Sequence, residues 1–471
     1  MKFACSALAL LIASAATAAA PDESVDPASL VNPFIGTTNG GNEVPGAVLP
    51  FGMVSFSPEE LPLPGSGLTV AAPGGYEWRS NGVRGFGLAH VSGSGCAGAG
   101  GDIPIMPVTR EIKTCPSGVG AANTYAAYLD HAKETASPGA YSVHLGNGVD
   151  VDLSATLRTG VARFVFPKDG KANLLFRTSD TEVGSTGATI RIDAAHRTVS
   201  GSVTSGNFCG YLSPDKRQSY YTLHFVAVFD QDFTAGGTWS DDTVTPGATT
   251  ADGGTGYGED GFPVAGKGSG GWISFDPAKA QTVTARIGIS YVDAAGARAN
   301  LDRESPAGAT MEATRAAARA AWNRQLGRIA IKGGTSDERT VFTTALYHSL
   351  IDPSIASDVD GRYRGMDGQV HRLVRRQDAQ YANFSGWDVY RSQLQLVTLL
   401  DPKVGGDIAQ SLLNQAEQNG GVWDRWTHMT GATSVMNGDP SPPAIAAIRS
   451  EERRVGKECA RLCRSRWSPY H

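Results

Sequence analysis

A compact group of chemically capable side chains follows Trp387, at Asp388, Arg391 and Ser392. Spacings of three and four residues would place them on one face of a helix, near its first turn. An acid, an arginine and an indole in such a group could bind a sugar through its hydroxyls and its apolar face. A simpler interpretation is that Asp388 caps the helix and Arg391 pairs with it, contributing a few tenths to about 1 kcal/mol. These residues alone favour the simpler interpretation.

The element that positions this group is predicted as one helix from Ser385 to about Leu400. Ser385 fits an N-cap, and Asp388 could be its partner in a capping box. Asp401 ends the helix, because the residue before a proline is pushed out of the α region. The apolar residues recur at spacings of three and four and form one stripe, Trp387, Tyr390, Leu394, Val397 and Leu400.

Two glycine-rich stretches, 31–53 and 85–96, are predicted to form irregular loops. With Trp78 and His90 nearby, such loops could contact a ligand through their backbone. Tight turns between strands are the alternative, and composition favours it. Asp439 precedes a proline and is typical of a turn, although it could instead orient a group in a cleft.

The first part of the chain has the pattern of β-structure. β-branched and aromatic runs are separated by Gly, Asp and Asn turns, without alternating helices, which predicts an antiparallel β-sandwich of undetermined strand order. The predicted strands cover 162–167, 172–178, 220–230, 271–276 and 281–293.

Helical patterns replace the strands near residue 300, so the sequence predicts two domains. Thr335 and Glu338 form a capping-box pattern, and a short strand is predicted at 329–332. Three further helices are predicted from apolar residues on one side: Met311, Ala318, Trp322 and Leu326; Val341, Phe342, Leu346 and Leu350; and Val404, Ile408 and Leu412.

The chain has 471 residues and a formal net charge of -5, which argues against nucleic acid or an anionic membrane as partner. Residues 1–20 resemble a secretory signal peptide, with Lys2 before an apolar run and Ala18-Ala19-Ala20 at the cleavage site. We therefore expect export to a periplasm or beyond. No later stretch is long and apolar enough to predict a membrane span.

The six cysteines do not form the paired Cys-x-x-Cys arrangement of a zinc site. One of them, Cys5, belongs to the predicted signal peptide. In an exported protein a disulfide such as Cys96–Cys115 is possible. Sequence alone does not establish the pairing.

Several motifs together resemble glycoside hydrolase family 92, the exported, calcium-dependent α-mannosidases. They occur in the family's order across residues 31 to about 448. A single one of these motifs would not be specific to the family, but six of them in the same order are. The matching stretches are Asn32-Pro-Phe-Ile-Gly36, Pro45-Gly-Ala47 with Pro50-Phe-Gly-Met53, Phe86 with His90-Val-Ser-Gly-Ser-Gly-Cys96, Asp102-Ile-Pro104, Ser385-Gly-Trp-Asp-Val-Tyr-Arg-Ser-Gln393, and Trp423 through Asp439.

The resemblance implies an N-terminal β-sandwich followed by an (α/α)6 barrel, with the active site where they meet. The implied division is 21–300 for the sandwich, 301–334 for a linker helix and connector, and 335–448 for the first part of the barrel. It also implies that Trp387, Asp388 and Arg391 contact sugar, that loops around Trp78 and His90 close the cleft, and that Asp439 lies in it.

The implied function is an exported α-mannosidase, of α-1,2 type, that removes terminal mannose from N-glycans or related mannosides with inversion. One carboxylic acid would protonate the leaving oxygen while a carboxylate activates water. Calcium, which takes oxygen ligands, would bind the 2- and 3-hydroxyls of the sugar. The alternative is a carbohydrate-binding β-sandwich without catalysis. An acid–base pair made of Asp388 and Asp439 has little support.

The family's acid lies in a Tyr-Thr-Glu-Gly-Asn type motif and its base in a Gly-Asn-Asp-Asp type motif, and neither occurs in residues 1–471. Residues 449–471 instead carry seven Lys or Arg and three Asp or Glu. This segment resembles translated adapter or vector sequence, although a genuine basic tail that binds a partner is the alternative. We therefore expect an inactive fragment that lacks the catalytic acid, the base and most calcium ligands.

Overall fold

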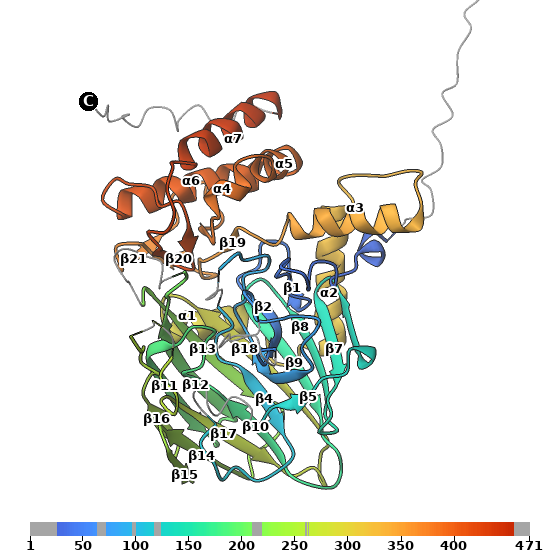
Figure 1. Ribbon diagram of the computed structural model, residues 1–471, viewed down its shortest axis with the longest axis vertical. Coiled ribbons are helices and arrows are strands. Elements are labelled where there is room, and N and C mark those ends of the chain that lie inside the picture. The colour runs from blue at the N-terminus through green and yellow to red at the C-terminus, as the bar shows by residue number, and fades with distance from the viewer. Residues whose placement is uncertain are drawn as a thin grey trace, which may run out of the picture.

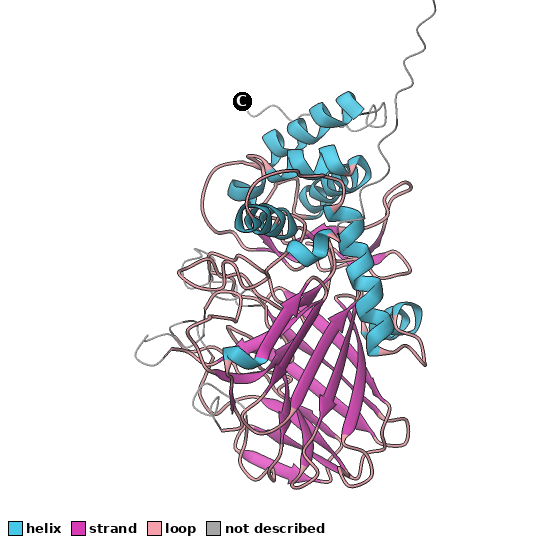
Figure 2. Cartoon of the chain, turned by 90° about the vertical axis from the view of Figure 1, so that its right-hand side faces the viewer, coloured by secondary structure: helices cyan, strands magenta, loops and turns pink. Residues whose placement is uncertain are grey.

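The computed structural model describes residues 26–63, 72–96, 100–116, 124–209, 219–259, 261 and 263–455. The predicted signal peptide lies outside these residues, and so does the 456–471 part of the predicted tail. The strands gather in one part of the molecule and most of the helices lie at one end of it (Figure 1, Figure 2). The predicted order, β-structure first and helices second, is confirmed.

Two antiparallel nine-stranded sheets form the N-terminal domain. The first has the order β1 (Ala47–Val48), β2 (Ser55–Glu60), β3 (Gly82–Gly87), β4 (Ile105–Val108), β10 (Ala172–Phe176), β17 (Ser269–Phe275), β14 (Ala235–Ser240) and β15 (Thr243–Pro246), with β5 (Ala127–Tyr128) beside β3. The second has the order β16 (Thr250–Asp252), β11 (Ser185–Asp193), β12 (Thr198–Ser205), β13 (Tyr221–Phe229), β18 (Thr282–Ser290), β9 (Thr159–Val165), β8 (Asp150–Ala155), β7 (Ala140–His144) and β6 (Glu134–Ser137). Short 3-10 turns, η1 (Pro27–Leu30) and η3 (His131–Lys133), precede β1 and β6.

The sheets bury their inner faces against each other. Alternate residues of β13 and β18, such as Phe225 and Ile287, are fully buried, as the two-residue period of a strand requires. The ring of Phe176 on β10 stacks with Phe225 on β13, at 6.1 Å between centroids. This contact joins the two sheets through the core, and all five predicted strands are confirmed as β9, β10, β13, β17 and β18.

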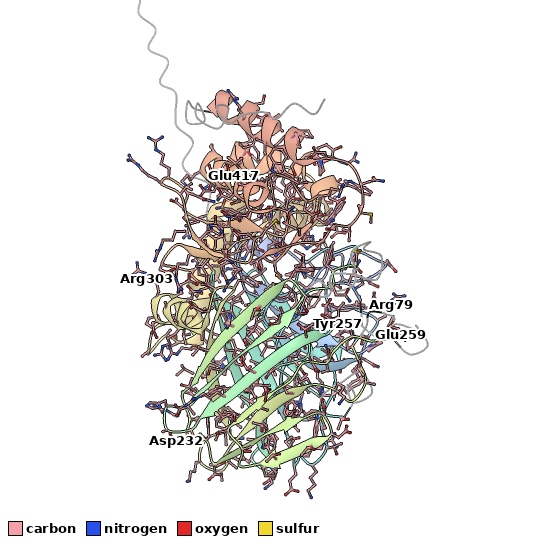
Figure 3. The ribbon with its side chains drawn as sticks, turned by 90° about the vertical axis from the view of Figure 1, so that its left-hand side faces the viewer. Arg79, Asp232, Tyr257, Glu259, Arg303 and Glu417 are labelled. Atoms are coloured by element: carbon pink, nitrogen blue, oxygen red, sulfur yellow. A yellow bond between two sulfur atoms is a disulfide. The ribbon has the colours of Figure 1, made fainter. Side chains whose placement is uncertain are left out.

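Two helices cover the outer face of the second sheet. Helix α1 (Ala294–Glu304) spans the predicted boundary at residue 300 and packs on β13 and β18 (Figure 3, where Arg303 marks it). Gly288 permits this approach, because an added Cβ would lie 2.2 Å from the carbonyl oxygen of Ala297. Helix α2 (Met311–Leu326) buries all four predicted apolar residues against the sheet.

Helix α3 (Ser336–His348) begins at the predicted capping box, which the structure confirms between Thr335 and Glu338. Its predicted apolar side is only partly buried, because Val341 and Phe342 are 57% and 43% exposed. The strand predicted at 329–332 is wrong, since these residues form a loop. The short strand pairs that follow are β19 (Ser354–Ile355) with β22 (Tyr381–Ala382), and β20 (Arg362–Arg364) with β21 (Val370–Arg372).

The helix predicted from Ser385 to Leu400 is broken into α4 (Gly386–Val389) and α5 (Gln393–Leu400). The halves are anchored to different segments, because Gly386 N–H donates to the Arg425 carbonyl while the Gln393 amide donates to the Ser349 carbonyl. The predicted capping box is also wrong: the Ser385 hydroxyl donates to the Asp388 carboxylate at 2.6 Å.

Helix α5 packs against α6 (Pro402–Gln418) and α7 (Ser441–Val455), with the hairpin of β23 (Thr427–His428) and β24 (Gly431–Ala432) between the last two helices in sequence. Leu394 and Val397 of the predicted stripe are buried in this contact. Helix α7 continues through residue 449, where the tail was predicted to begin. None of the helices in the described ranges is long and apolar enough to cross a bilayer.

The disulfide joins Cys96 to Cys209, whose Cα atoms are 5.4 Å apart. The pairing of Cys96 with Cys115 is therefore wrong. The sulfur of Cys115 instead lies against the carbonyl of Asp241.

Candidate functional site

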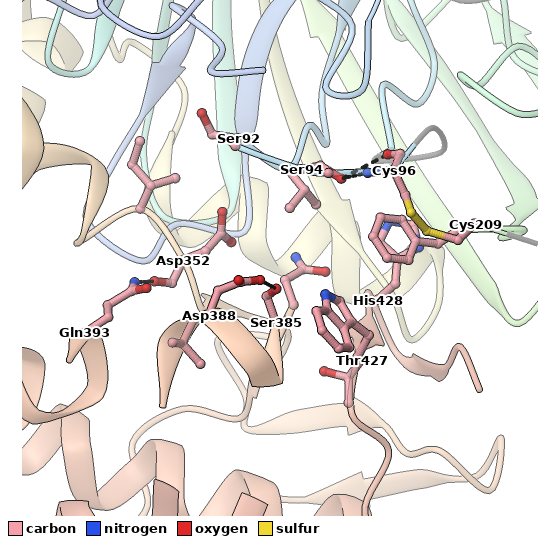
Figure 4. Close-up of a pocket in the computed structure, with 18 of the residues that line it drawn as sticks. Ser92, Ser94, Cys96, Cys209, Asp352, Ser385, Asp388, Gln393, Thr427 and His428 are labelled. Carbon is pink, nitrogen blue, oxygen red and sulfur yellow. Dashed lines mark hydrogen bonds between the residues drawn. A yellow bond between two sulfur atoms is a disulfide. The ribbon is translucent and has the colours of Figure 1, made fainter. Parts of the chain in front are cut away.

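A cavity of about 410 Å³ lies where loops of the sandwich meet the helical part of the chain (Figure 4). Its volume is within the range of small-molecule sites. Polar and apolar side chains both line it. Among them are Glu43, Ser92, Ser94, the Cys96–Cys209 disulfide, Phe208, His348, Asp352, Asn383, Asp388, Gln393, Trp426, His428, Val435 and Met436.

The sandwich side of the cavity is formed by the second predicted glycine-rich loop, whose residues 91–96 all line it. The loop is held from both sides, since Asn42 donates to the Ser94 carbonyl at 2.8 Å and Cys96 is bonded to Cys209. The Ser92 hydroxyl donates to Glu43 at 2.5 Å. The prediction that this loop contacts a ligand stays a prediction, but the loop lies where such contact is possible.

Glu43 links the two domains at the cavity wall. Its carboxylate oxygen Oε1 lies 3.5 Å from Nδ1 of His348, at the end of α3. Burial raises the pKa of Glu43 to about 7 and lowers the pKa of His348 to about 4. The short separation would suit an ion pair, but burial disfavours both charges. The imidazole of His348 is therefore neutral at pH 7, and its approach to Glu43 is a contact rather than an ion pair.

Asp352 is a second half-buried carboxyl in the wall, and this burial raises its pKa to about 7. Its backbone carbonyl accepts a 2.6 Å hydrogen bond from the side-chain amide of Gln393. Carboxyls that titrate near neutral pH can either donate to or accept from a hydroxyl group. The ability to donate and the ability to accept both suit a neutral ligand rich in hydroxyl groups.

Asp388 is the one predicted site residue that lines the cavity, where it is exposed. Its predicted partner Arg391 makes no ion pair with it; Nε of Arg391 donates to the Trp387 carbonyl at 3.0 Å, and the guanidinium lies over the Tyr390 ring. The Trp387 indole donates to the Asn437 carbonyl and packs edge-on against Trp426, 5.0 Å between centroids. Trp387 thus supports a cavity residue without lining the cavity.

The other three predicted residues lie elsewhere. Trp78 stacks on His131 at 4.2 Å. Asp439 is exposed on the loop before α7 and is not part of the cavity wall, so the structure does not bring it into the cavity with Asp388. His90 is buried inside the sandwich, with Nδ1 2.8 Å from the Gly74 carbonyl.

His90 belongs to a buried ionic group that we call the sandwich cluster, made of Glu59, Arg84, His90, Asp180 and Glu182. Arg84 contacts Glu59 at 2.6 Å and Asp180 at 3.4 Å. Burial lowers the pKa of His90, but the nearby Glu182 and Glu59 outweigh it and raise that pKa above its usual value. The cluster thus pairs acidic and basic groups inside one domain.

Much of the cavity wall lies in the motifs recognised in the sequence, but sequence reasoning named only Asp388 of the wall as a site residue. Phe208 and Cys209 lie in the segment that follows β12 and pack with Val435. No local pattern marks them, whereas Trp426 and His428 were within a recognised motif. The aromatic and carboxyl groups together form an amphipathic site of the kind that binds sugars.

The described residues contain no group of three or more His, Cys, Asp or Glu that could hold a metal ion. The cavity carboxyls therefore do not fit the predicted calcium site by themselves.

Two family models cover almost the whole described chain. The glycosyl hydrolase family 92 N-terminal domain matches residues 30–290, and the family's catalytic domain matches residues 296–458. The chain belongs to glycosyl hydrolase family 92. The sequence-based assignment and the predicted succession of an antiparallel β-domain and a helical domain are confirmed.

Solved structures of the family resemble this family 92 chain. The α-mannosidase BT3965 from Bacteroides thetaiotaomicron, in complex with mannoimidazole, is 26% identical with a TM-score of 0.77, over 91% of this chain and 53% of that one. The inverting mannosidase BT2199 of the same bacterium is 27% identical with a TM-score of 0.72, over 89% and 52%. An uncharacterized secreted glycosidase of Arthroderma benhamiae is 28% identical over 69% of this chain and 41% of its own length. The chain thus spans about half the length of these structures and less of that relative.

Proposed function

We propose that the protein is an exported α-mannosidase, of α-1,2 type, that removes terminal mannose from N-glycans or related mannosides with inversion. The observation that carries the proposal is the amphipathic cavity between the β-domain and the helical domain of a family 92 chain. Asp388, Glu43 and Asp352 offer hydrogen bonds to sugar hydroxyls, and Trp426 and Phe208 offer apolar surface. The mannosidase and mannoimidazole descriptions of the similar structures and the secreted description of the fungal relative support it.

Hydrolysis belongs to the whole protein in this proposal. Inversion needs an acid and a base on opposite sides of the glycosidic bond, and the motifs expected to carry them do not occur in residues 1–471. We therefore propose that this chain binds terminal mannose without cleaving it. Calcium binding stays a prediction for the whole protein, because the described residues supply no ligand cluster.

Calorimetry with methyl α-mannoside tests the proposal, with methyl α-glucoside as the control that differs only at the 2-hydroxyl. We expect saturable binding of the mannoside and weaker binding of the glucoside, in buffers with calcium and with a chelator. Equal binding of both sugars, or of neither, would count against a mannose site. Release of mannose from α-1,2-mannobiose by the 471-residue chain would contradict the expectation that it does not hydrolyse.

A further inference from the structure

His90 lies directly before the loop 91–96, which forms the sandwich side of the cavity. Its side chain does not line the cavity, because it is completely buried inside the sandwich. Both of its ring nitrogens lie against backbone carbonyl oxygens: Nδ1 is 2.8 Å from that of Gly74, and Nε2 is 3.2 Å from that of Ser57. The ring therefore joins the start of this loop to two other segments of the sandwich.

These two contacts determine how many protons the ring carries. A carbonyl oxygen can only accept a hydrogen bond, so each ring nitrogen that is bonded to one must carry a hydrogen. A neutral imidazole has a single N–H and would turn the lone pair of its other nitrogen towards a carbonyl oxygen. An imidazolium donates from both nitrogens, and it is the form that satisfies both contacts.

The groups packed around the ring compensate this charge. Within the sandwich cluster, the carboxylate of Glu182 lies 3.6 Å from Nδ1 of His90. Glu59 of β2 and Asp102, which precedes β4, are further acids that interact with the ring. Arg84 of β3, the other cation of the cluster, is paired with the cluster's other two acids. Burial lowers the pKa of His90, but Glu182 and Glu59 raise it by more.

The contact with Gly74 connects the ring to the cavity wall. A Cβ added at Gly74 would lie 2.8 Å from the carbonyl oxygen of Asn42 and 3.5 Å from that of Val91, the first residue of the loop. The side chain of Asn42 donates to the Ser94 carbonyl at 2.8 Å, and its own carbonyl accepts from the N–H of Gly93 at 3.0 Å. Because these segments are closely packed, a displacement of the Gly74 carbonyl would be transmitted to the loop that lines the cavity.

We propose that His90 is doubly protonated in the folded chain at neutral pH, and that its charge positions the 91–96 loop for mannoside binding. Loss of one proton would turn a nitrogen lone pair towards a carbonyl oxygen, so one of the two segments would move away and loosen the loop. Because the pKa is raised in the folded chain, this contribution is complete at low pH and is lost as the pH rises through that pKa. His90 is thus a positioning residue that acts through the loop and does not touch the sugar. The inference rests on the mannoside binding proposed above.

Nitrogen-15 spectra of the unchanged chain test the protonation directly. At pH 7 we expect both ring nitrogens of His90 to carry hydrogen, whereas a neutral ring has one bare nitrogen. The signals are assigned through the α-hydrogens of Gly75 and Gly87, where an added Cβ would lie 3.0 Å from Nδ1 and 2.8 Å from Nε2. A bare nitrogen at pH 7 would overturn the inference, and so would a ring that keeps both hydrogens until the chain unfolds.

Calorimetry with methyl α-mannoside, on both sides of the pH at which His90 loses its proton, tests the positioning. For the unchanged chain we expect the affinity to fall about fivefold or more across this step. His90→Gln has no proton to lose, so its affinity should be about fivefold weaker at pH 7 and should lack the step. The control is His196→Gln, which removes an exposed histidine paired with Asp193 and should keep both the affinity and the step. Any step that comes from the cavity carboxyls remains in all three chains.

The outcomes separate this inference from the proposed function. A step that persists in His90→Gln would contradict the positioning role while leaving mannoside binding in place. An affinity of the unchanged chain that stays constant where the nitrogen-15 spectra show the proton leaving would contradict it without any variant. A folded unchanged chain that binds no mannoside at any pH would remove the proposed function, and the positioning role with it, whatever the spectra show.

Discussion

The sandwich cluster and the cavity wall use the same kinds of residues in opposite ways. In the cluster, Glu59 and Asp180 both lie within ion-pair distance of Arg84. In the cavity wall, Asp388 accepts from the hydroxyl of Ser385, and no lysine or arginine in the described residues pairs with it. Ionisable groups buried within one domain are paired with groups of the same domain. Polar groups at the junction of the two domains can still form hydrogen bonds with a ligand.

The largest effect is expected from breaking the sandwich cluster. Arg84→Met would leave the buried Glu59 carboxylate without its main partner, and removing one side of a buried pair costs about 3–5 kcal/mol. Urea unfolding of the 471-residue chain measures this cost. The control is Arg298→Met, which removes an exposed pair with Asp302 and should cost no more than about 1 kcal/mol. Equal losses for the two variants would show that the cluster contributes no more than a surface pair.

A smaller and different effect is expected in the cavity. Asp388→Asn keeps the size of the side chain but removes its charge, so affinity for methyl α-mannoside should fall about tenfold. Because Asp388 is exposed, the free energy of unfolding should change by less than about 0.5 kcal/mol. Calorimetry and urea unfolding give the two numbers, with the exposed Asp302→Asn as control. A loss of stability without a loss of affinity would give Asp388 a structural role, through its hydrogen bond with Ser385, in place of a role in sugar binding.

The half-buried carboxyls of the cavity, Glu43 and Asp352, should shape the dependence of stability on pH. The pKa values of Glu43 and Asp352 are raised to about 7, so the folded chain keeps protons that the unfolded chain releases from about pH 4 upward. Their contribution to stability is therefore greatest at low pH and is lost as the pH rises to about 7. In the double variant Glu43→Gln, Asp352→Asn, this part of the decline should vanish.

Thermal unfolding between pH 4 and 8 checks this sign. Burial also raises the pKa of Asp102, to about 8, and that of Glu59, to about 7. Their contribution has the same sign and remains in the double variant, so the difference between the two curves isolates the cavity. The exposed Glu417→Gln should reproduce the unchanged curve. A double variant with the original slope would contradict the burial of these two carboxyls.

Periodic strands and helices were predictable from the sequence, but strand β2 was not. All six residues of β2 are buried, including Pro58, Glu59 and Glu60. It therefore lacks the alternation of apolar and polar residues that marks a half-buried strand. The glutamates are tolerated there because residues far away in sequence provide for them, as Arg84 does for Glu59. Local sequence patterns do not reveal such distant partners.

The cavity was predictable only in part, for a related reason. Asp388 and Trp426 belong to local motifs, whereas Phe208 meets His428 only because of how the strands are ordered and how the hairpin folds back. The sequence left that order undetermined. The break between α4 and α5 has the same origin, because contacts to Arg425 and Ser349 override a stretch that is helical by its own pattern.

The smallest effect is expected at Trp78, which the sequence placed near the sugar. Its ring stacks on His131 and meets Phe34 edge-on at 5.2 Å, and it is not part of the cavity wall. Trp78→Ala should therefore change the affinity for methyl α-mannoside by less than about twofold, or about 0.4 kcal/mol. Trp426→Ala is the matched aromatic control inside the wall, where loss of a packed ring should weaken binding about tenfold or more. A tenfold loss from Trp78→Ala would place this loop against the ligand after all, and the binding site would then extend from the cavity across the sandwich face.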